Sequence, residues 1–585
     1  MCGIAGLAYA SDAPPPEPAL LATMLHALGH RGPDGFAGAI AGQVALGHRR
    51  LAVIDVAGGI QPLIAGDTVM VANAEIYNYP ELRAELPGIS FTTGSDCESA
   101  LHLWRDRGPQ FIDSLRGMYA MAIYDQGARV LTLCRDPFGI KPLYITKIPG
   151  GTAFASEPRA LLAAGLARRE VLPQARAELL QMQFSVGGNT VFPDIQRVLP
   201  GEMIRITNGA VSAREATSVV PDGGPEKMRE ADALRRLDRA LTESIALHLR
   251  SDVPVGLFLS GGIDSATVLA CLARQYARVP AYTAGFDVRG AADERGEAAR
   301  LAKSVGTEHI PVTVTESATL RHLPAIAACM DDPAADYAII PAWFLARRAR
   351  QDVKVVLSGE GGDELFAGYG RYRTAARAWW RGRRRMRDHG TFAGLGVLRS
   401  DLPDWRTDWA AVEAAARPQQ TRLQAAQAAD IAEWLPNDLL LKLDRCLMAH
   451  GVEGRTPLLD RAVANAALRL PDNMKIRRGR GKYLLRRWLA SALPAARATA
   501  PKQGFTVPVG AWIAQHGDRF GALMAALPCV QEVADPDRVR ALFRAAAGRR
   551  QSLAAWSLLF YALWHRAHIE EIPTDADVFD FLAAK

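Results

Sequence analysis

The alternation of strands and helices between residues 231 and 357 most constrains the fold of this 585-residue chain. Leucine and isoleucine recur at helical spacing from Leu234 to Leu249. Short apolar runs then alternate with helical stretches, at Val255 to Leu259, Ala281 to Phe286, His309 to Val314 and Val353 to Leu357. Strands that alternate with helices favour a parallel, doubly wound α/β sheet. From about residue 365 the chain is predicted to be mainly helical.

The residues before this region follow another pattern, which predicts a separate layered α+β domain over 2–205. Apolar runs at Val69 to Ala72, Ala120 to Tyr124 and Val130 to Leu133 alternate with turn residues. Two helical patterns interrupt them, around 18–28 and 98–107. Residues 206–230 lose periodicity and contain Asn208-Gly209, so we predict a linker there and a second domain over 231–585.

Charge and cysteine content exclude several classes of protein. The 69 basic and 62 acidic side chains leave a net charge of +7, which does not by itself imply nucleic-acid binding. None of the seven cysteines forms a Cys-x-x-Cys pair, which disfavours a disulfide scaffold or a structural zinc site. No apolar stretch approaches about 18 residues, and the start lacks a basic segment. We therefore expect a cytoplasmic protein with no membrane or nucleic-acid partner.

Cys2 is the first candidate for chemistry. Removal of Met1 would place a thiol and a free α-amine on one residue, and the amine could act as a base toward its own thiol. The turn Asn73-Ala74-Glu75 offers a side-chain amide and backbone N–H groups, which an oxyanion hole requires. Asp96 precedes a helical stretch and, taken alone, fits a helix N-cap.

Two Gly-rich loops, each after a predicted strand, form the second candidate site. Ser260-Gly261-Gly262-Ile263-Asp264-Ser265 connects a strand to a helix, a geometry that presents backbone N–H groups to phosphate. The loop Ser358-Gly359-Glu360-Gly361-Gly362-Asp363 follows a later strand, at the edge where α/β sheets bind ligands. Asp264 and Asp363 are suitable carboxylate ligands for Mg²⁺ that bridges phosphates.

Together, the motifs of the first domain resemble the class II glutamine amidotransferase domain, an N-terminal-nucleophile glutaminase of layered antiparallel sheets with helices. The resemblance implies that Cys2 is the nucleophile and that Asn73 and the N–H of Ala74 form the oxyanion hole. It also implies glutamine binding by Arg50, Asn73, Glu75 and Asp96, with Arg50 and Asp96 on the α-carboxylate and α-amine. The family usually has glycine where this chain has Ala74. A positive φ there would cost about 1 kcal/mol or more.

The loop at Ser260 resembles the PP-loop of ATP pyrophosphatases, which adenylate a substrate. With Leu443-Asp444-Arg445, the segment 448–460, Lys482 and Lys502, the chain resembles glutamine-hydrolysing asparagine synthetases from Cys2 to about Trp564. This implies ATP, Mg²⁺, glutamine and aspartate, with Glu360 and Lys502 catalytic at the β-aspartyl-AMP step, and a homodimer as a further possibility. The implied ATP-binding residues are Phe258, Leu259, Ser260, Gly261, Gly262, Asp264, Ser265, Ala284, Ser358 and Gly359, and the implied metal ligands, through pyrophosphate, are Asp264 and Asp363.

Other interpretations of the sequence stay open. A related amidotransferase could amidate a different carboxylate, and Ala74 is the feature that would suit an inactive regulatory relative. A PP-loop protein that acts on tRNA is disfavoured by the complete glutaminase motif set. The arginine-rich runs at 381–387 and 477–487 are predicted to be solvated faces, and His450 is given no catalytic role.

Overall fold

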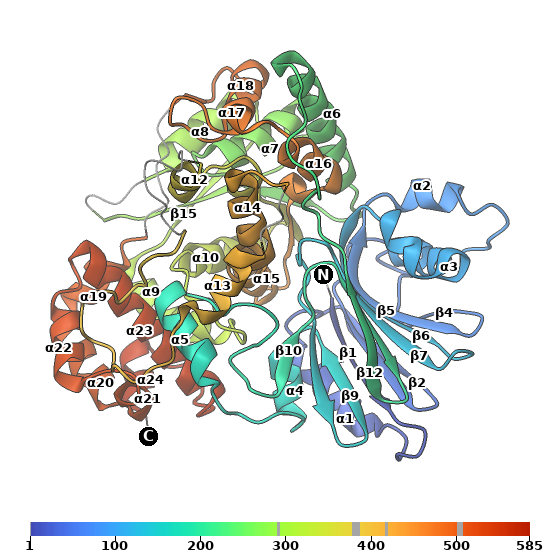
Figure 1. Cartoon of the computed structure of the whole chain (residues 1–585), viewed down its shortest axis with the longest axis horizontal. Helices are drawn as coiled ribbons and strands as arrows, with labels where there is room; N and C mark the ends of the chain where they lie inside the picture. The colour runs from blue at the N-terminus through green and yellow to red at the C-terminus, as the bar shows by residue number, and fades with distance from the viewer. Residues whose placement is uncertain are drawn as a thin grey trace.

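The computed structural model of the chain describes residues 2–275, 277–288, 293–376, 386–415, 419–499 and 507–584. Figure 1 shows three parts: a β-rich N-terminal domain, an α/β domain, and a group of helices formed largely by the C-terminal residues. This arrangement confirms the predicted fold class, an α+β domain of antiparallel sheets followed by a parallel α/β domain with a helical C-terminal part.

Two six-stranded antiparallel sheets face each other in the N-terminal domain. The first has the order β10 (Ile195–Arg197), β8 (Tyr144–Ile148), β9 (Gly151–Ala155), β1 (Gly3–Tyr9), β3 (Val44–Arg50) and β2 (Gly35–Ala41). The second has the order β12 (Ala210–Ala216), β11 (Glu202–Thr207), β7 (Val130–Arg135), β6 (Gly117–Asp125), β5 (Thr68–Ile76) and β4 (Leu63–Ala65). Apolar side chains of both sheets, such as Ile4 and Val71, form one core between them.

Helices cover the outer faces of this sandwich. One face is covered by α1 (Pro18–Ala27) and α4 (Pro158–Ala163), and the other by α2 (Tyr79–Ala84), α3 (Asp96–Arg107) and the 3₁₀ helix η1 (Gly108–Asp113). The two helices expected around 18–28 and 98–107 are therefore present as α1 and α3.

The predicted linker begins inside this domain. Asn208 and Gly209 both have positive φ, at 50° and 75°, and they join β11 to β12 as a tight hairpin turn. Asn-Gly is a strong hairpin signal for that reason, because both residues tolerate the left-handed conformation. Residues 210–216 form an edge strand of the second sheet, so this part of 206–230 is not a linker.

A parallel five-stranded sheet forms the centre of the second domain, in the order β15 (His309–Thr313), β14 (Ala281–Gly285), β13 (Val255–Phe258), β16 (Val355–Leu357) and β17 (Glu453–Arg455). The four predicted strands are confirmed. The fifth, β17, has the sequence Glu-Gly-Arg and gives no apolar signal. The strand order reverses direction between β13 and β16, where a ligand-binding crevice is expected in such a sheet.

Helices α6 (Glu230–His248), α7 (Ile263–Arg274), α8 (Arg295–Ser304), α9 (Glu316–Ala328) and α10 (Ile339–Ala349) accompany this sheet. In the described part after residue 360 the chain forms, besides β17, helices and short turns. They are α11 (Gly362–Leu365), α12 (Gly370–Ala375), α13 (Arg406–Ala414), α14 (Arg422–Ala429), the π-helix η3 (Asp430–Leu440), α15 (Leu441–Met448), η4 (Pro457–Leu459), α16 (Arg461–Leu468), α17 (Asp472–Lys475), α18 (Tyr483–Ala492), α19 (Val509–Gln515), α20 (Gly517–Ala526), α21 (Pro528–Gln531), α22 (Pro536–Arg544), α23 (Arg549–His568) and α24 (Val578–Ala583).

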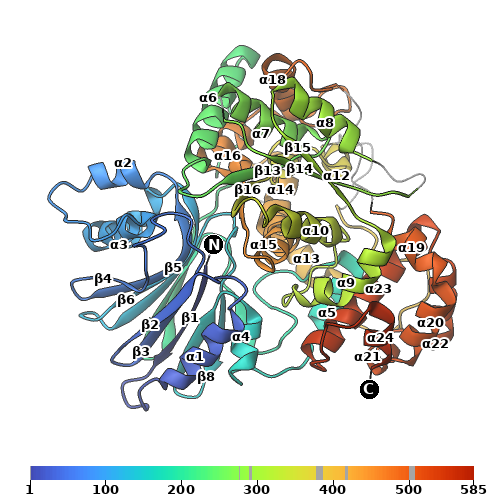
Figure 2. The same ribbon diagram turned by 180° about the vertical axis from the view of Figure 1, so that it is seen from behind.

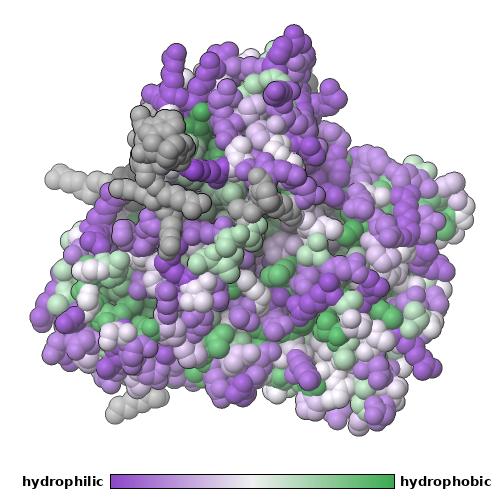
Figure 3. Space-filling view, viewed as in Figure 1, coloured by the Kyte–Doolittle hydropathy of each residue, from purple (hydrophilic) through white to green (hydrophobic). Residues whose placement is uncertain are grey.

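The N-terminal domain also contacts the C-terminal helices. Its helix α5 (Pro173–Met182) extends away from the sheets and packs against α23 (Figures 1 and 2). On the face drawn in Figure 3, polar residues predominate and apolar residues are scattered among them. Within the described ranges, no helix is both long and apolar enough to cross a bilayer.

Candidate active sites

Cys2 lies directly before β1 and is buried, with 8 % of its surface exposed. Its backbone N–H donates to Oδ1 of Asn73 at 3.0 Å, and its thiol lies 3.8 Å from the carbonyl oxygen of Leu51. Burial raises the pKa of the Cys2 thiol, so a nearby base is needed to form the thiolate. Asn73 Nδ2 is buried and has no hydrogen-bond partner within the described residues. An unsatisfied buried donor beside a nucleophile suits an oxyanion hole.

Ala74 does not have the conformation that would strain an alanine. It lies in the extended strand β5, opposite Tyr119 of β6, and is not among the positive-φ residues. Tyr119 uses its N–H and its carbonyl for bonds to Asp136, away from β5. In an antiparallel ladder, the N–H of Ala74 therefore points toward the opposite edge of β5. The penalty, which was expected only for a positive φ, therefore does not apply to Ala74.

The edge of β5 that Ala74 faces is otherwise occupied. The N–H of Ala72 donates to Gln61 Oε1 at 2.6 Å, and the N–H of Ile76 donates to Asp96 Oδ2 at 2.6 Å. Between them, the N–H of Ala74 meets no acceptor in the part of the chain that the structure describes. The strand therefore presents one open N–H next to Asn73, the second donor that the sequence predicted.

Asp96 is the first residue of α3, and Ser95 is its N-cap, with the Ser95 hydroxyl accepting from Cys97 N–H. The N-cap interpretation of Asp96 is therefore wrong, because its carboxylate turns instead toward β5. Burial raises the pKa of Asp96 to about 6. The other predicted glutamine ligand, Arg50, donates to the carbonyl oxygens of Asp55 at 2.5 Å and Val56 at 3.0 Å.

In the second domain, both predicted Gly-rich loops line one cavity of about 650 Å³. All ten predicted ATP-binding residues lie in its wall, together with Glu360 and Asp363. A side chain at Gly359 would put a Cβ 2.8 Å from the backbone nitrogen of Ser265, so glycine allows the two loops to touch. The first loop leads into the N-terminus of α7, a geometry that suits a phosphate.

Charged groups gather at one end of this cavity, beside the loop 260–265. The Lys482 ammonium lies 2.5 Å from Asp264 Oδ2 and 2.7 Å from Asp363 Oδ1, so the two carboxylates converge on one point. Glu360 lies nearby, and burial raises its pKa while Lys442 opposes the rise. The predicted catalytic Lys502 lies outside the described residues. Sequence reasoning gave no role to Lys442, which also lines the cavity.

Motifs that the sequence analysis left without a role meet at the interface of the two domains. Arg31 is fully buried; its Nε donates to the Cys2 carbonyl at 3.0 Å, and its Nη atoms bind Asp444 at 2.7 and 2.9 Å. Arg455, in β17, bonds Glu75 at 2.7 Å and Glu453 at 2.6 Å. The carboxylate of Glu75, predicted to bind glutamine, is therefore engaged by the second domain.

The prediction of solvated faces holds for most of the second arginine-rich run, because Arg477, Arg478, Arg480 and Arg487 are exposed, but it is wrong for Arg387 of the first run. Residues 381–385 lie outside the described part, but Arg387 lies over the rings of Trp434, Trp409 and Phe184 at 4.4, 4.9 and 5.2 Å. In the second run, Arg486 lines the cavity. His450 packs edge-on against Trp343 at 4.5 Å, a structural position.

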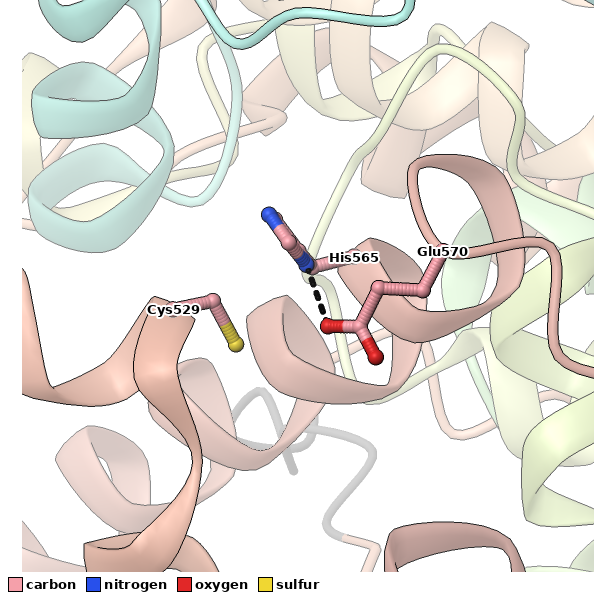
Figure 4. Close-up of side chains that lie close together, drawn as sticks. All are labelled: Cys529, His565 and Glu570. Atoms are coloured by element: carbon pink, nitrogen blue, oxygen red, sulfur yellow. Dashed lines mark hydrogen bonds and ion pairs between the residues drawn. The ribbon is translucent and has the colours of Figure 1, made fainter. Parts of the chain in front are cut away.

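One further cluster lies among the C-terminal helices (Figure 4). One ligand atom each from Cys529, His565 and Glu570 lie within 4.8 Å of one another, and His565 Nδ1 is 3.1 Å from Glu570 Oε1. Burial raises the pKa of Cys529 to about 12, so its thiol is protonated. The hydrogen bond between His565 and Glu570 joins the last turn of α23 to the residues that follow it. The cluster is separate from both candidate sites.

Comparison with known proteins agrees with this geometry in both halves. The asparagine synthase family model matches residues 236–566, and the glutamine amidotransferase domain model matches residues 1–216. A Mycobacterium bovis protein, provisionally named a glutamine-hydrolysing asparagine synthetase, is 34 % identical over 97 % of this chain and 98 % of its own. The corresponding values are 31 %, 98 % and 97 % for Bacillus subtilis asparagine synthetase 1, and 28 %, 83 % and 78 % for Escherichia coli asparagine synthetase B.

Among solved structures, a B. subtilis glutamine phosphoribosylpyrophosphate amidotransferase matches 53 % of this chain and 65 % of its own, with 18 % identity and a TM-score of 0.28. That weak match adds nothing to the assignment. The two family models and the nearly full-length relatives, in contrast, agree with one another over both domains. The chain belongs to the glutamine-hydrolysing asparagine synthetase family.

Proposed function

We propose that this protein uses glutamine as the nitrogen donor and ATP as the energy source to amidate aspartate, forming asparagine, glutamate, AMP and pyrophosphate. The observation that carries the proposal is the convergence of the loops 260–265 and 358–363 on one cavity. It lies in a chain whose other domain holds a buried cysteine against an asparagine amide.

In the first domain, the Cys2 thiolate attacks the carboxamide carbon of glutamine. The oxyanion that forms is held by Asn73 Nδ2 and the N–H of Ala74, two neighbouring donors that meet no acceptor in the described residues. Ammonia leaves, and water hydrolyses the thioester to glutamate. After removal of Met1, the α-amine of Cys2 would be the base, with Asn73 Oδ1 orienting it.

In the second domain, a carboxylate oxygen of the acceptor attacks the α-phosphorus of ATP and pyrophosphate leaves. The backbone N–H groups at the start of α7 bind phosphate, and Lys482 offers positive charge beside it. Ammonia then attacks the acyl carbon, and AMP leaves with the phosphate oxygen. Glu360, with its pKa raised by burial, is placed to move a proton in this second step. The predicted role of Lys502 at the phosphates stays a prediction.

The carboxylates of Asp264 and Asp363 fit the predicted Mg²⁺, because they converge on one point and such oxygens suit this ion. When bound with pyrophosphate oxygens, Mg²⁺ would neutralise charge on the leaving group. Arg50 and Asp96 are proposed to bind the α-carboxylate and α-amine of glutamine, as a charged pair suits a zwitterion.

One experiment tests the whole proposal. The purified protein is incubated with glutamine, MgATP and a panel of carboxylic acids that includes aspartate, and AMP and any new amide are detected by mass. Asparagine formation is the expected result. Formation of a different amide would show that another carboxylate is the acceptor. Formation of no amide and no AMP would favour an inactive relative. The predicted homodimer is a separate question, which light scattering answers.

A further inference from the structure

Lys442 is a buried cation in the wall of the ATP cavity, at its Glu360 side. Its side chain is 8 % exposed, and its ammonium donates to Asp336 Oδ2 at 2.7 Å. An ammonium has three N–H donors, and this is its one hydrogen bond within the described residues. Two donors therefore remain for a ligand in a position where an unused donor is costly.

The surroundings keep this lysine charged. Asp336, Glu360 and Asp438 raise the pKa of Lys442 despite its burial. Asp438 lies four residues before Lys442 and is fully buried, and neither of its carboxylate oxygens has a hydrogen-bond partner in the described parts of the chain. Asp336 also accepts from the N–H of Ala338 at 3.0 Å, which fixes the carboxylate that orients the ammonium.

The other cations of the cavity wall contact groups other than Glu360, and Lys482 already has a proposed role at the phosphates. Lys482 is shared by Asp264 and Asp363, and Arg486 donates to the carbonyls of Gly481 and Ala498 at 3.0 and 2.7 Å. Arg497 faces Glu297 at 3.8 Å. Among the described residues that line the cavity, Lys442 is thus the cation near Glu360 with donors to spare.

We propose that Lys442 binds the second carboxylate of the acceptor and so determines which acceptors the site prefers. This inference rests on the proposed function, because one carboxylate must be adenylated at the nucleotide loops. A second carboxylate that enters a buried site needs a charged partner, and a charge-assisted hydrogen bond to Lys442 provides it. For aspartate, the β-carboxylate is activated and the α-carboxylate is held by Lys442.

The test compares L-aspartate with 3-aminopropanoate, which is aspartate without its α-carboxylate. AMP release is measured with ammonium as the nitrogen source, for wild type and Lys442→Met. We expect kcat/KM for aspartate to fall about 10²-fold, as for a lost hydrogen bond between charged groups, and kcat/KM for 3-aminopropanoate to change little. The KM for ATP should also change little, and the preference for aspartate should collapse.

Matched variants separate recognition from folding. Lys442→Met leaves Asp336 buried without its partner, so the double variant with Asp336→Asn removes both charges. Lys303→Met, the same substitution on the exposed face of α8, is the control and should leave kcat/KM for both acceptors unchanged. Equal falls for both acceptors, no fall for aspartate, or a wild type that prefers monocarboxylates would overturn the inference.

Direct binding keeps this result distinct from the proposed function. Calorimetry with L-aspartate, in the presence of an ATP analogue that cannot release pyrophosphate, needs no turnover. Weaker binding to Lys442→Met supports the role of Lys442 even if wild type forms no AMP, in which case the proposed function fails. Equal binding to wild type and variant refutes the role of Lys442.

Discussion

Asn73→Asp is a sharp test of the glutaminase site, because it exchanges one donor for an acceptor of the same size. Asn73 is fully buried; its Oδ1 accepts from the Cys2 N–H, and its Nδ2 has no partner in the described residues. The variant keeps the first contact and loses the second. One oxyanion donor contributes about 2.7–4 kcal/mol to the transition state, so glutaminase kcat should fall about 10²–10³-fold.

The assay measures glutamate release from glutamine and, separately, ammonium-dependent AMP formation. Only the first should fall, because Asn73 does not line the ATP cavity. Asn208→Asp is the matched control, since that residue lies in the β11–β12 turn and tolerates the same change. Alkylation of Cys2 by iodoacetamide reports whether the thiol is still in place. A fall of less than tenfold with normal alkylation would show that Nδ2 does not meet the oxyanion.

Four further changes test the two sites. Cys2→Ala should abolish glutamine hydrolysis and keep ammonium-dependent synthesis; loss of both, measured on one preparation, would mean that the sites are not separable. Glu360→Gln should remove synthesis and keep glutaminase turnover, and near-normal AMP release would exclude the proposed role. Ala74→Gly should leave glutaminase kcat/KM unchanged or lower, since Ala74 is already extended and glycine adds about 0.5–1 kcal/mol of backbone freedom, whereas a clear increase would contradict the strand geometry. The KM for glutamine should rise as the pH falls through about 6, because Asp96 must be charged to hold an ammonium and its raised pKa lies there; Asp96→Asn should remove that pH dependence.

The sequence predicts well where chemistry follows a strand. The loops 260–265 and 358–363 lie far apart in the chain, but β13 and β16 are parallel neighbours, so their carboxyl ends meet. The rule explains why these two loops share one cavity, whereas the individual ATP-binding residues, Ala284 of β14 among them, were implied by the resemblance. The strand β17 could not be predicted in this way, because its sequence Glu-Gly-Arg has no strand signal and is extended through its pairing with β16. The turn signal Asn208-Gly209 is likewise ambiguous by itself, because it forms a hairpin rather than a linker only when β11 and β12 both join the sheet.

Local patterns also misjudge side chains whose partners lie far away along the chain. Asp96 has an N-cap composition, yet the adjacent Ser95 caps α3 and frees Asp96 for β5. Arg387 belongs to a basic run, yet three aromatic rings surround it. In both cases the deciding contact joins residues distant in sequence, and spacing along the chain carries no information about it.

Buried ion pairs join the two domains and hold their two candidate sites in a fixed arrangement. Arg31 binds the backbone carbonyl of Cys2, the proposed nucleophile, and the carboxylate of Asp444, which belongs to the second domain. A buried arginine is costly unless its donors are satisfied, so separating the domains would expose or orphan charges on both sides. The same holds for Arg455 with Glu75, the strand neighbour of Ala74. Arg31 and Glu75, which lie beside Cys2 and Ala74, are therefore held by contacts from the second domain, and a shift of that domain would disturb both side chains.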